Sequence, residues 1–323
     1  MISGKNILVT GGAGFIATHV VDRLLDARRI TLLDIDLANA LPFTDLADRD
    51  NVRTVEGDVR DSKLVHELVM EHDIVLHFAS LIGVQHVMQR ARDTIDTIIL
   101  GTRNVLEACA QRGKIDRLIY ISTSEVYGNI MNATEGAAAS VGTANDSRLC
   151  YASAKLMGEH QVWAYHRDFG LPTVIIRPFN IYGARRKAGH AVGYFVVKAL
   201  AGSDITVHGD GSQLRSWCYI DDFADGIAAC INREEAIGQD YNLGNPVTAT
   251  TIYDLAQRII RLAESPSRIV STPYTFNDIG VRAPNSQKAR EHLDYEARFD
   301  LEEGLTRTIA WYREHLSHFQ HWR

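Results

Sequence analysis

The chain has 323 residues, 46% of them hydrophobic, so it can bury a large core in one big domain or two closely associated ones. Its net charge of −6 argues against a nucleic-acid partner, and no apolar run is long enough to span a membrane. The four cysteines (Cys109, Cys150, Cys218 and Cys230) show no CxxC spacing. This predicts reduced structural thiols in a cytoplasmic protein, with neither a disulfide framework nor a metal site.

Short β-branched runs alternate with helical patterns through the first half of the chain. The run after Lys5 resembles a signal peptide, but it is short and leads into glycines, so we expect a buried strand. The predicted strands are 6–10, 30–35, 52–58, 73–79, 117–122 and 173–178. Helical spacing lies between them, at 19–28, 62–72, 97–113 and 153–170. This alternation predicts an α/β fold with a Rossmann-type, doubly wound parallel sheet that binds ligands at the carboxyl ends of its strands.

The composition changes after the sixth predicted strand. Glycine, arginine and aromatic residues mix through 179–221, which predicts a loop-rich substrate region, whereas 222–234 is helical and should pack back on the large sheet. Further helical patterns lie at 251–265 and 301–316. We therefore expect a cofactor-binding domain over 1–178, to which 222–245 returns, and a smaller C-terminal substrate-binding domain over 179–323.

The stretch GGAGFIA follows the first predicted strand and opens a helix. Its glycines, Gly11 and Gly14 among them, allow a tight turn and let the backbone approach a pyrophosphate. The helix start at Phe15 and Ile16 offers amides to that anion. Asp34 ends the second strand about twenty residues on, where a carboxylate accepts from ribose hydroxyls and repels a 2′-phosphate. This context favours NAD over NADP as the cofactor.

Other residues at strand ends extend the predicted cofactor site. Asp58 and Val59 follow the third strand and should lie near the adenine. Asp58 would serve equally well as a helix cap, a role for which Asp61 competes. Ala79 ends the fourth strand at the same edge of the sheet.

Tyr151 and Lys155 are four residues apart, which places both on one face of a helix. Tyrosine, with an ordinary pKa of about 10, is a poor base at neutral pH. A nearby lysine and the charge of a nicotinamide ring favour the phenolate, and the lysine can also bond the nicotinamide ribose. The fifth strand ends in STSEVYG, with the hydroxyls of two serines and a threonine and one carboxylate. Together these features predict a base, its supporting cation and a polar strand end around a nicotinamide.

The chain resembles the extended short-chain dehydrogenases/reductases of the nucleotide-sugar epimerase/dehydratase type. The matching stretches occur in family order over nearly the whole length: TGGAGFIATH, HFAS, STSEVYG, YASAK, RPFNIYG, GDGSQLRSWCYIDD and YNLGN. The resemblance implies an NAD-binding Rossmann domain, a nucleotide-sugar domain and a homodimer formed through a helix bundle. It also implies that Thr123 binds the sugar 4-oxygen, that Tyr151 is the base and that Lys155 supports it.

The resemblance further implies contacts with a UDP-sugar substrate. Asn180 and Arg215 match positions that hold the diphosphate. Arg148 and Arg282 are candidates for the diphosphate or for a carboxylate, since a guanidinium grips either with two hydrogen bonds. A surface ion pair is an equal alternative for Arg148. Ser124 is expected at the substrate as well.

The strand end also bears on the reaction. These enzymes first oxidise the sugar at C4, and the ketone makes a carboxylate at C5 a β-keto acid. A 4-epimerase needs no carboxylate beside Thr123, and a 4,6-dehydratase needs an acid where this chain has Ser124, which is too weak. The order Thr-Ser-Glu resembles UDP-glucuronate decarboxylases. We therefore expect an NAD-dependent decarboxylase that forms a 4-keto-pentose or, after re-reduction, UDP-xylose.

Glu125 is the residue on which this choice depends. Its charge beside a substrate carboxylate would favour loss of CO2 by repulsion, unless one carboxyl is protonated. Alternatively, Glu125 caps a turn or pairs with an arginine. A 4-epimerase, a 4,6-dehydratase and a non-catalytic NAD-binding regulator stay open as alternatives, although intact Thr123, Tyr151 and Lys155 argue against the last.

Overall fold

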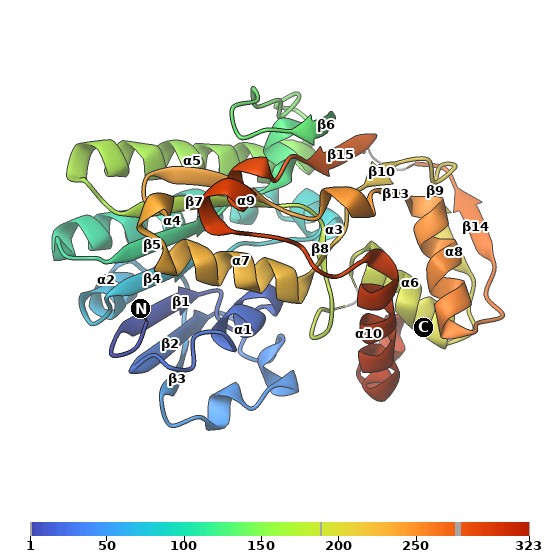
Figure 1. The fold of residues 1–323 in the computed structure, drawn as a ribbon, viewed down its shortest axis with the longest axis horizontal. Helices are drawn as coiled ribbons and strands as arrows, with labels where there is room; N and C mark the ends of the chain where they lie inside the picture. Colours follow the sequence, from blue (N-terminus) through green and yellow to red (C-terminus); the bar gives the residue numbers. More distant parts are fainter. Residues whose placement is uncertain (1, 188, 275–278, 323) are drawn as a thin grey trace.

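The computed structural model describes residues 2–187, 189–274 and 279–322, and its centre is a seven-stranded parallel sheet (Figure 1). The strand order is β12-β7-β5-β4-β1-β2-β3. These strands are β1 (Asn6–Thr10), β2 (Arg29–Asp34), β3 (Val52–Glu56), β4 (Ile74–His77), β5 (Arg117–Ile121), β7 (Thr173–Pro178) and β12 (Gln239–Leu243). The order reverses between β1 and β4, which is the point where ligands bind in such sheets. The predicted Rossmann-type α/β fold is confirmed.

Helices cover both faces of the sheet. One face carries α1 (Phe15–Val21) and α7 (Ile220–Asn232), and the other carries α2 (Ser62–Met70), α4 (Ala91–Arg112) and α5 (Cys150–Phe169). Within β1, Ile7 and Val9 join the core on the α1 side, whereas Leu8 joins the core on the α4 side. All three side chains are fully buried, which is why the strand is apolar along its whole length.

The structure differs from the predictions in one helix end, in helices that the patterns miss and in the strands that follow the sixth predicted one, together with β6. All six predicted strands are present, but the pattern at 19–28 predicts a helix where α1 ends already at Val21. Turns between residues three apart follow α1, and Leu24 is fully buried without being helical. The sequence patterns also miss three helices: α3 (Val84–Gln89), α6 (Ala191–Leu200) and α9 (Gln287–Leu293).

Smaller sheets lie beside the large one (Figure 1). One has the order β13-β10-β15-β6, and two more are the pairs β11–β8 and β14–β9. Their strands are β6 (Ile130–Ala133), β8 (Ile181–Tyr182), β9 (Ile205–His208), β10 (Leu214–Arg215), β11 (Cys218–Tyr219), β13 (Thr250–Thr251), β14 (Ile269–Thr272) and β15 (Val281–Pro284). The helices α6, α8 (Ile252–Ala263) and α10 (Leu301–Glu314) pack together in the same part of the molecule as these smaller sheets. The chain therefore passes between the two parts several times, since β6 precedes β7 and β12 follows β11.

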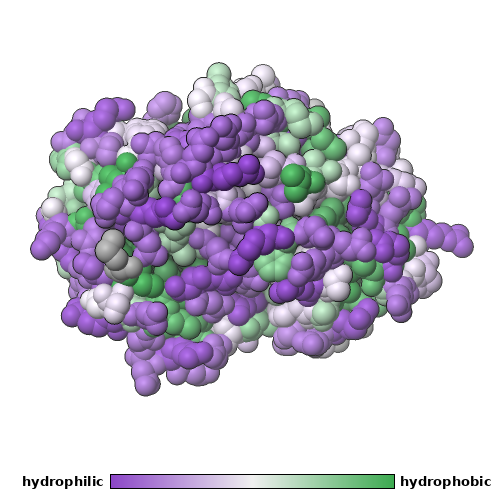
Figure 2. Space-filling model, viewed as in Figure 1, coloured by the Kyte–Doolittle hydropathy of each residue, from purple (hydrophilic) through white to green (hydrophobic). Residues whose placement is uncertain are grey.

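The face of the molecule drawn in Figure 2 is predominantly polar. Figure 2 shows one face on which hydrophilic residues prevail and hydrophobic residues form small separate patches. The longest helix, α4, carries charges along its length, among them Arg92, Asp96 and Glu107. Within the described ranges, no helix combines the length and apolar character that a membrane span requires.

Candidate functional site

The loop between β1 and α1 lies tightly against the neighbouring strand end. Gly11 has a φ of +69°, and a Cβ on it would lie 2.8 Å from the backbone nitrogen of Ala79. The amide of Gly14 closes the turn by donating to the carbonyl of Gly11 at 3.0 Å. Phe15 and Ile16 follow as the first residues of α1. A side chain would fill this cradle, so its glycines fit the close approach of a dinucleotide pyrophosphate.

Asp34 ends β2 beside this loop. Its Oδ2 accepts from the amide of Ala13 at 3.0 Å, and its Oδ1 accepts from the amide of Asp36 at 3.1 Å. Burial raises the pKa of Asp34 above its ordinary value, although the amide bonds oppose the shift. Each carboxyl oxygen keeps a further lone pair. The position of Asp34 and the lone pairs left on its carboxylate fit hydrogen bonds from the ribose hydroxyls of NAD.

Asp58 follows β3 but its carboxylate is already paired. The Nη2 of Arg60 lies 2.6 Å from its Oδ2, and this hydrogen bond lowers the pKa of Asp58. The N-cap of α2 is Asp61, which accepts from the amides of Lys63 and Leu64. The helix-cap alternative for Asp58 is therefore wrong. A ligand that binds at Asp58 would also contact Arg60.

Val59 and Ala79 lie at the same edge of the sheet. Val59 is buried against α4, where a Cβ on Gly101 would lie 2.6 Å from its Cγ1. The amide of Ala79 donates to Oγ1 of Thr10 at 3.3 Å. The same Oγ1 lies 2.7 Å from Nδ1 of His77, whose burial lowers its pKa to about 3. This histidine is therefore a neutral structural group behind the cofactor loop.

Thr123 and Tyr151 meet at the end of β5. The Thr123 hydroxyl lies close enough to Tyr151 to lower the pKa of the phenol. Thr123 caps a short 3-10 turn (Ser124–Tyr127) by accepting from the amide of Glu125 at 3.2 Å. Both Thr123 and Ser124 are buried. The turn thus holds the threonine hydroxyl where it can serve a tyrosine and a substrate oxygen together.

Lys155 lies one helical turn after Tyr151 on α5 and points to the strand end. Its Nζ donates to the carbonyl of Ile121 at 2.7 Å and lies 5.1 Å from the centroid of the Tyr120 ring. The side chain is fully buried, and this burial lowers its pKa to about 7. The ammonium is thus anchored at the end of β5 and loses its proton near neutral pH.

The charges around Tyr151 act in opposite directions. Burial and the negative charge of Glu125 raise the pKa of its hydroxyl, and the bond to Thr123 and the charges of Arg282 and Arg186 lower it. The net effect is a pKa above the ordinary value, so the tyrosine is neutral at pH 7. The positive nicotinamide of bound NAD would add a charge of the sign that favours the phenolate.

Glu125 lies between two arginines from distant parts of the chain. Arg148 binds it with two hydrogen bonds of 2.7 and 3.1 Å, and Nη1 of Arg282 lies 3.3 Å from its Oε1. Burial opposes ionisation, but the charges of Arg282 and Arg148 outweigh it and lower the pKa of Glu125. Glu125 is therefore an ionised carboxylate paired with arginine, which is the alternative given for it from the sequence.

Arg282 connects this cluster to Asn180. Its Nη2 donates to Oδ1 of Asn180 at 2.8 Å, and Nδ2 of Asn180 donates to the carbonyl of Ser216 at 2.7 Å. Arg215 lies opposite Arg282 in the pairing of β10 with β15. Its guanidinium faces the backbone carbonyls of 279–280, with a bond of 3.2 Å to that of Gly280. Thr123, Glu125, Tyr151, Arg148, Arg282 and Asn180 thus form one connected cluster.

Two features of the site are missing from the predicted set. The hydroxyl of Ser122 donates to Glu159, which pairs with Arg177 at 2.6 Å inside the core, so this strand-end hydroxyl has a structural role. The guanidinium of Arg186 lies over the ring of Phe15, 5.1 Å from its centroid, beside the cofactor loop. The sequence signal for Arg186 is a run of three cations at 185–187, but the run alone does not show what it faces.

The fold and the cofactor loop define an enzyme of the short-chain dehydrogenase/reductase class. Within that class, residues 7–244 match the NAD dependent epimerase/dehydratase family, and the chain belongs to this family. Its cofactor is NAD. The resemblance found in the sequence motifs is therefore confirmed.

Two relatives are similar over nearly the whole chain. UDP-N-acetyl-alpha-D-glucosaminuronate decarboxylase of Bacillus cytotoxicus is 34% identical over 321 residues, covering 96% of this chain and 98% of the relative. UDP-glucuronic acid decarboxylase 1 of Danio rerio is 33% identical over 320 residues, covering 97% of this chain and 74% of the relative.

Solved structures of other enzymes share the fold. The dTDP-glucose 4,6-dehydratase of Bacillus anthracis in complex with NAD is 25% identical, with a TM-score of 0.86 and coverage of 99% of this chain and 100% of that one. UDP-glucose 4-epimerase of Thermotoga maritima with UDP-glucose is 25% identical, with a TM-score of 0.85 and coverage of 96% and 99%. Because the similar proteins catalyse different reactions, the choice among them depends on the side chains of the site.

Proposed function

We propose that the protein is an NAD-dependent UDP-glucuronate decarboxylase. The observation that carries this proposal is the ionised Glu125 held between Arg148 and Arg282 beside the Thr123–Tyr151 pair. Bound NAD would supply the hydride acceptor for C4 of the sugar and, where the product is re-reduced to UDP-xylose, the hydride donor. The protein's own side chains carry out the remaining steps of the reaction.

Tyr151 takes the proton of the sugar 4-hydroxyl, and Thr123 donates to the same oxygen. Because burial raises the pKa of this tyrosine, proton removal depends on the cations around it, Arg282 and Arg186, and on the nicotinamide charge. Lys155, which donates to the carbonyl of Ile121 at the end of β5, is the proposed partner of the nicotinamide ribose. The resulting 4-ketone makes the C5 carboxylate a β-keto acid, which loses CO2 without an acid at C6. The electron pair of the broken C5–C6 bond passes to the ketone oxygen as an enolate, which is then protonated at C5.

The two arginines are the groups suited to a substrate carboxylate. Arg148 and Arg282 are both bound by Glu125 in this structure, so an entering carboxylate competes with Glu125 for them. Two carboxylates then share two guanidiniums, and their repulsion raises the energy of the bound substrate relative to the state that has lost CO2. Asn180 and Arg215, next to this cluster, are proposed contacts for the diphosphate.

The charge of Glu125 also weighs against dehydration. A 4,6-dehydratase must protonate the departing 6-hydroxyl, and a carboxylate whose pKa is lowered by two arginines is a poor acid. Ser124 is too weak an acid for the same task. A 4-epimerase stays the second candidate, because it needs only Thr123, Tyr151 and space for the ketosugar to rotate.

The proposal is tested by the products formed from nucleotide sugars. The purified enzyme is incubated with UDP-glucuronate, UDP-N-acetylglucosaminuronate and UDP-glucose, and the products are identified by mass spectrometry with trapping of CO2. Release of CO2 from UDP-glucuronate supports the proposal, and the 4-keto-pentose is distinguished from UDP-xylose by two mass units. An isomer of equal mass would show an epimerase, and loss of water a dehydratase. NAD binding without any product would show a regulator.

Glu125→Gln is the variant that tests the role of the carboxylate. It keeps the size of the side chain and removes the charge that competes for Arg148 and Arg282. We expect slower CO2 release with NAD binding unchanged. Release at the wild-type rate would overturn the role assigned to Glu125.

We also propose a cytoplasmic homodimer. The helices α4 and α5 pack against each other on one side of the molecule (Figure 1) and expose the large apolar side chains of Ile95, Leu100, Met157 and Phe169. A second copy of the chain covering these side chains would remove them from water. The four free cysteines are compatible with a reducing compartment.

A further inference from the structure

Four consecutive residues from outside the large sheet contact the cofactor side of the molecule. They are residues 184–187, which follow β8 and are called the strap below. The carbonyl of Ala184 accepts from Nε2 of His19 at 3.2 Å. Arg185 forms an ion pair with Asp22 at 2.6 Å. Both partners belong to α1 or its C-terminal end.

The second half of the strap contacts two more positions. The guanidinium of Arg186 lies over the ring of Phe15, and Nζ of Lys187 lies 3.1 Å from Oδ2 of Asp36. Phe15 opens α1 directly after the glycine loop, and Asp36 follows the end of β2 by two residues. The strap thus links the two segments that flank the pyrophosphate cradle and the ribose carboxylate.

The backbone of the strap is held in an uncommon conformation. Arg185 has a φ of +62°, which residues other than glycine rarely adopt. Such a conformation persists where the surroundings fix it, and the partly buried ion pair with Asp22 does so here. Before the strap, Gly183 is packed so tightly that a Cβ on it would lie 2.4 Å from Cγ2 of Ile220. The strap therefore begins after the tightly packed Gly183, and the ion pairs of Arg185 and Lys187 hold its remaining residues.

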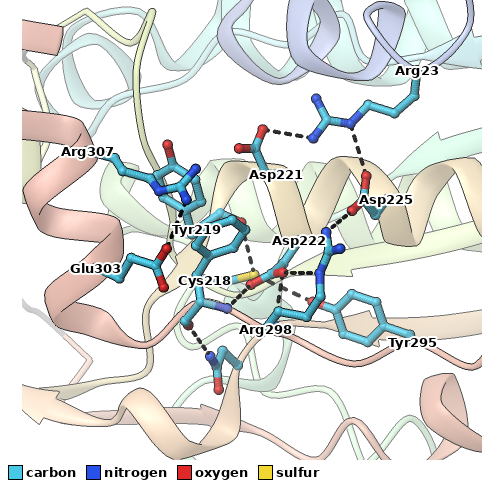
Figure 3. Close-up of polar contacts among 12 residues, drawn as sticks. Arg23, Cys218, Tyr219, Asp221, Asp222, Asp225, Tyr295, Arg298, Glu303 and Arg307 are labelled. Atoms are coloured by element: carbon cyan, nitrogen blue, oxygen red, sulfur yellow. Dashed lines mark hydrogen bonds and ion pairs between the residues drawn. The ribbon is translucent and has the colours of Figure 1, made fainter.

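The helix that receives the strap is itself fixed. Figure 3 shows Arg23, two residues after the end of α1, between two carboxylates of α7, with 2.8 Å to Asp221 and 3.0 Å to Asp225. Asp225 also pairs with Arg298, which precedes α10 (Figure 3). The strap therefore contacts a helix whose C-terminal end is itself held to α7.

We propose that the strap retains the dinucleotide between the two hydride transfers of one catalytic cycle. An enzyme that oxidises a sugar and then reduces the product must keep its reduced cofactor, and this part of the inference rests on the proposed function. In this proposal the cofactor enters and leaves its cradle between α1 and the loop after β2. The ion pairs of Arg185 and Lys187 close the strap across these two segments, so they have to break before NADH leaves.

The test measures the dissociation of NADH, without any sugar, by the loss of its fluorescence on displacement with excess NAD. In Arg185→Gln/Lys187→Gln, both ion pairs are gone, and we expect NADH to leave about fivefold faster or more. The matched control is Arg29→Gln, which breaks a partly exposed ion pair of 3.0 Å with Glu71 at the opposite end of β2. NADH should leave this control at the wild-type rate.

A charge swap separates the ion pair from general damage to the fold. Arg185→Asp alone should speed NADH release, and adding Asp22→Arg should slow it again by restoring an ion pair of reversed polarity. Aspartate tolerates the positive φ of this position better than most residues. Lys187→Gln, at an exposed side chain, should retain the wild-type Tm and still speed release. Wild-type NADH release in the double Gln variant and in Arg185→Asp would overturn the proposal. Because no sugar is present, this outcome is independent of whether the enzyme is a decarboxylase.

Discussion

Removal of Arg148 should destabilise the protein through the carboxylate that it leaves behind. In Arg148→Gln, Glu125 loses hydrogen bonds of 2.7 and 3.1 Å and keeps the 3.3 Å contact with Arg282. Removing one partner of a buried ion pair costs about 3–5 kcal/mol. Since Arg282 remains and the Glu125 side chain is 16% exposed, we expect a loss near the lower end, about 3 kcal/mol in the free energy of unfolding.

The loss of stability in Arg148→Gln should depend on pH. The pKa of Glu125 is lowered in the folded protein, so its ion pairs stabilise the fold above the unfolded pKa of about 4.3. This stabilisation disappears as the pH falls through the lower, folded pKa. Without Arg148, one cause of the lowering is gone and Glu125 protonates more readily. The difference between Arg148→Gln and the wild type should therefore be largest at neutral pH and shrink as the pH approaches 4.

Urea unfolding at several pH values measures both effects. The double variant Arg148→Gln/Glu125→Gln should be more stable than Arg148→Gln, because it removes the buried charge together with its partner. Arg49→Gln, which breaks an exposed ion pair of 2.6 Å with Asp45, is the control and should change stability by about 0.5 kcal/mol or less. A cost below about 1 kcal/mol for Arg148→Gln at pH 7, or a double variant less stable than the single one, would refute the reasoning.

Three further predictions concern the proton acceptor, the cofactor and the dimer. Tyr151→Phe should slow CO2 release from UDP-glucuronate by about a hundredfold or more while NAD affinity, from fluorescence titration, stays close to wild type. Asp34→Ser removes the charge that repels a 2′-phosphate, so the preference for NAD over NADP in the same titration should fall about tenfold, or about 1.4 kcal/mol. Leu100→Asp/Met157→Asp places charges on the exposed apolar sides of α4 and α5 and should give a monomer in analytical ultracentrifugation, whereas an unchanged dimer would exclude this interface.

The strands could be predicted because burial on both faces leaves a strong local pattern. The strand β1 (NILVT) has apolar residues at consecutive positions, as a sheet with two covered faces requires. The strand β12 (QDYNL) has no such pattern and is extended because it pairs with β7. The helix α6 (AVGYFVVKAL) is apolar nearly all round, with valines and a glycine, so neither its period nor its propensity indicates a helix.

The site shows the same division between local and long-range information. The spacing of Tyr151 and Lys155 and the hydroxyls after β5 are local, and in the structure Thr123 is close enough to Tyr151 to lower its pKa. Arg148 and Arg282 are 134 residues apart in sequence and meet only because β15 pairs with β6 and β10 near the 3-10 turn. Their shared ion pair with Glu125 therefore could not be read from spacing. The direction of Lys155 toward Ile121 is likewise a product of packing.

The exchange of strands between the two parts of the molecule affects how the chain can fold. The large sheet is complete only when β12, far along the sequence, pairs with β7, and β6 finds its partner β15 later still. A fragment ending at Pro178 would present β7 as a bare edge and leave β6 without its partner, two features that promote aggregation. Most of the chain must thus be synthesised before either sheet can close. We expect slow folding, because contacts between residues distant in sequence form slowly. We also expect one cooperative unfolding transition for the whole chain and not a separate one for each part.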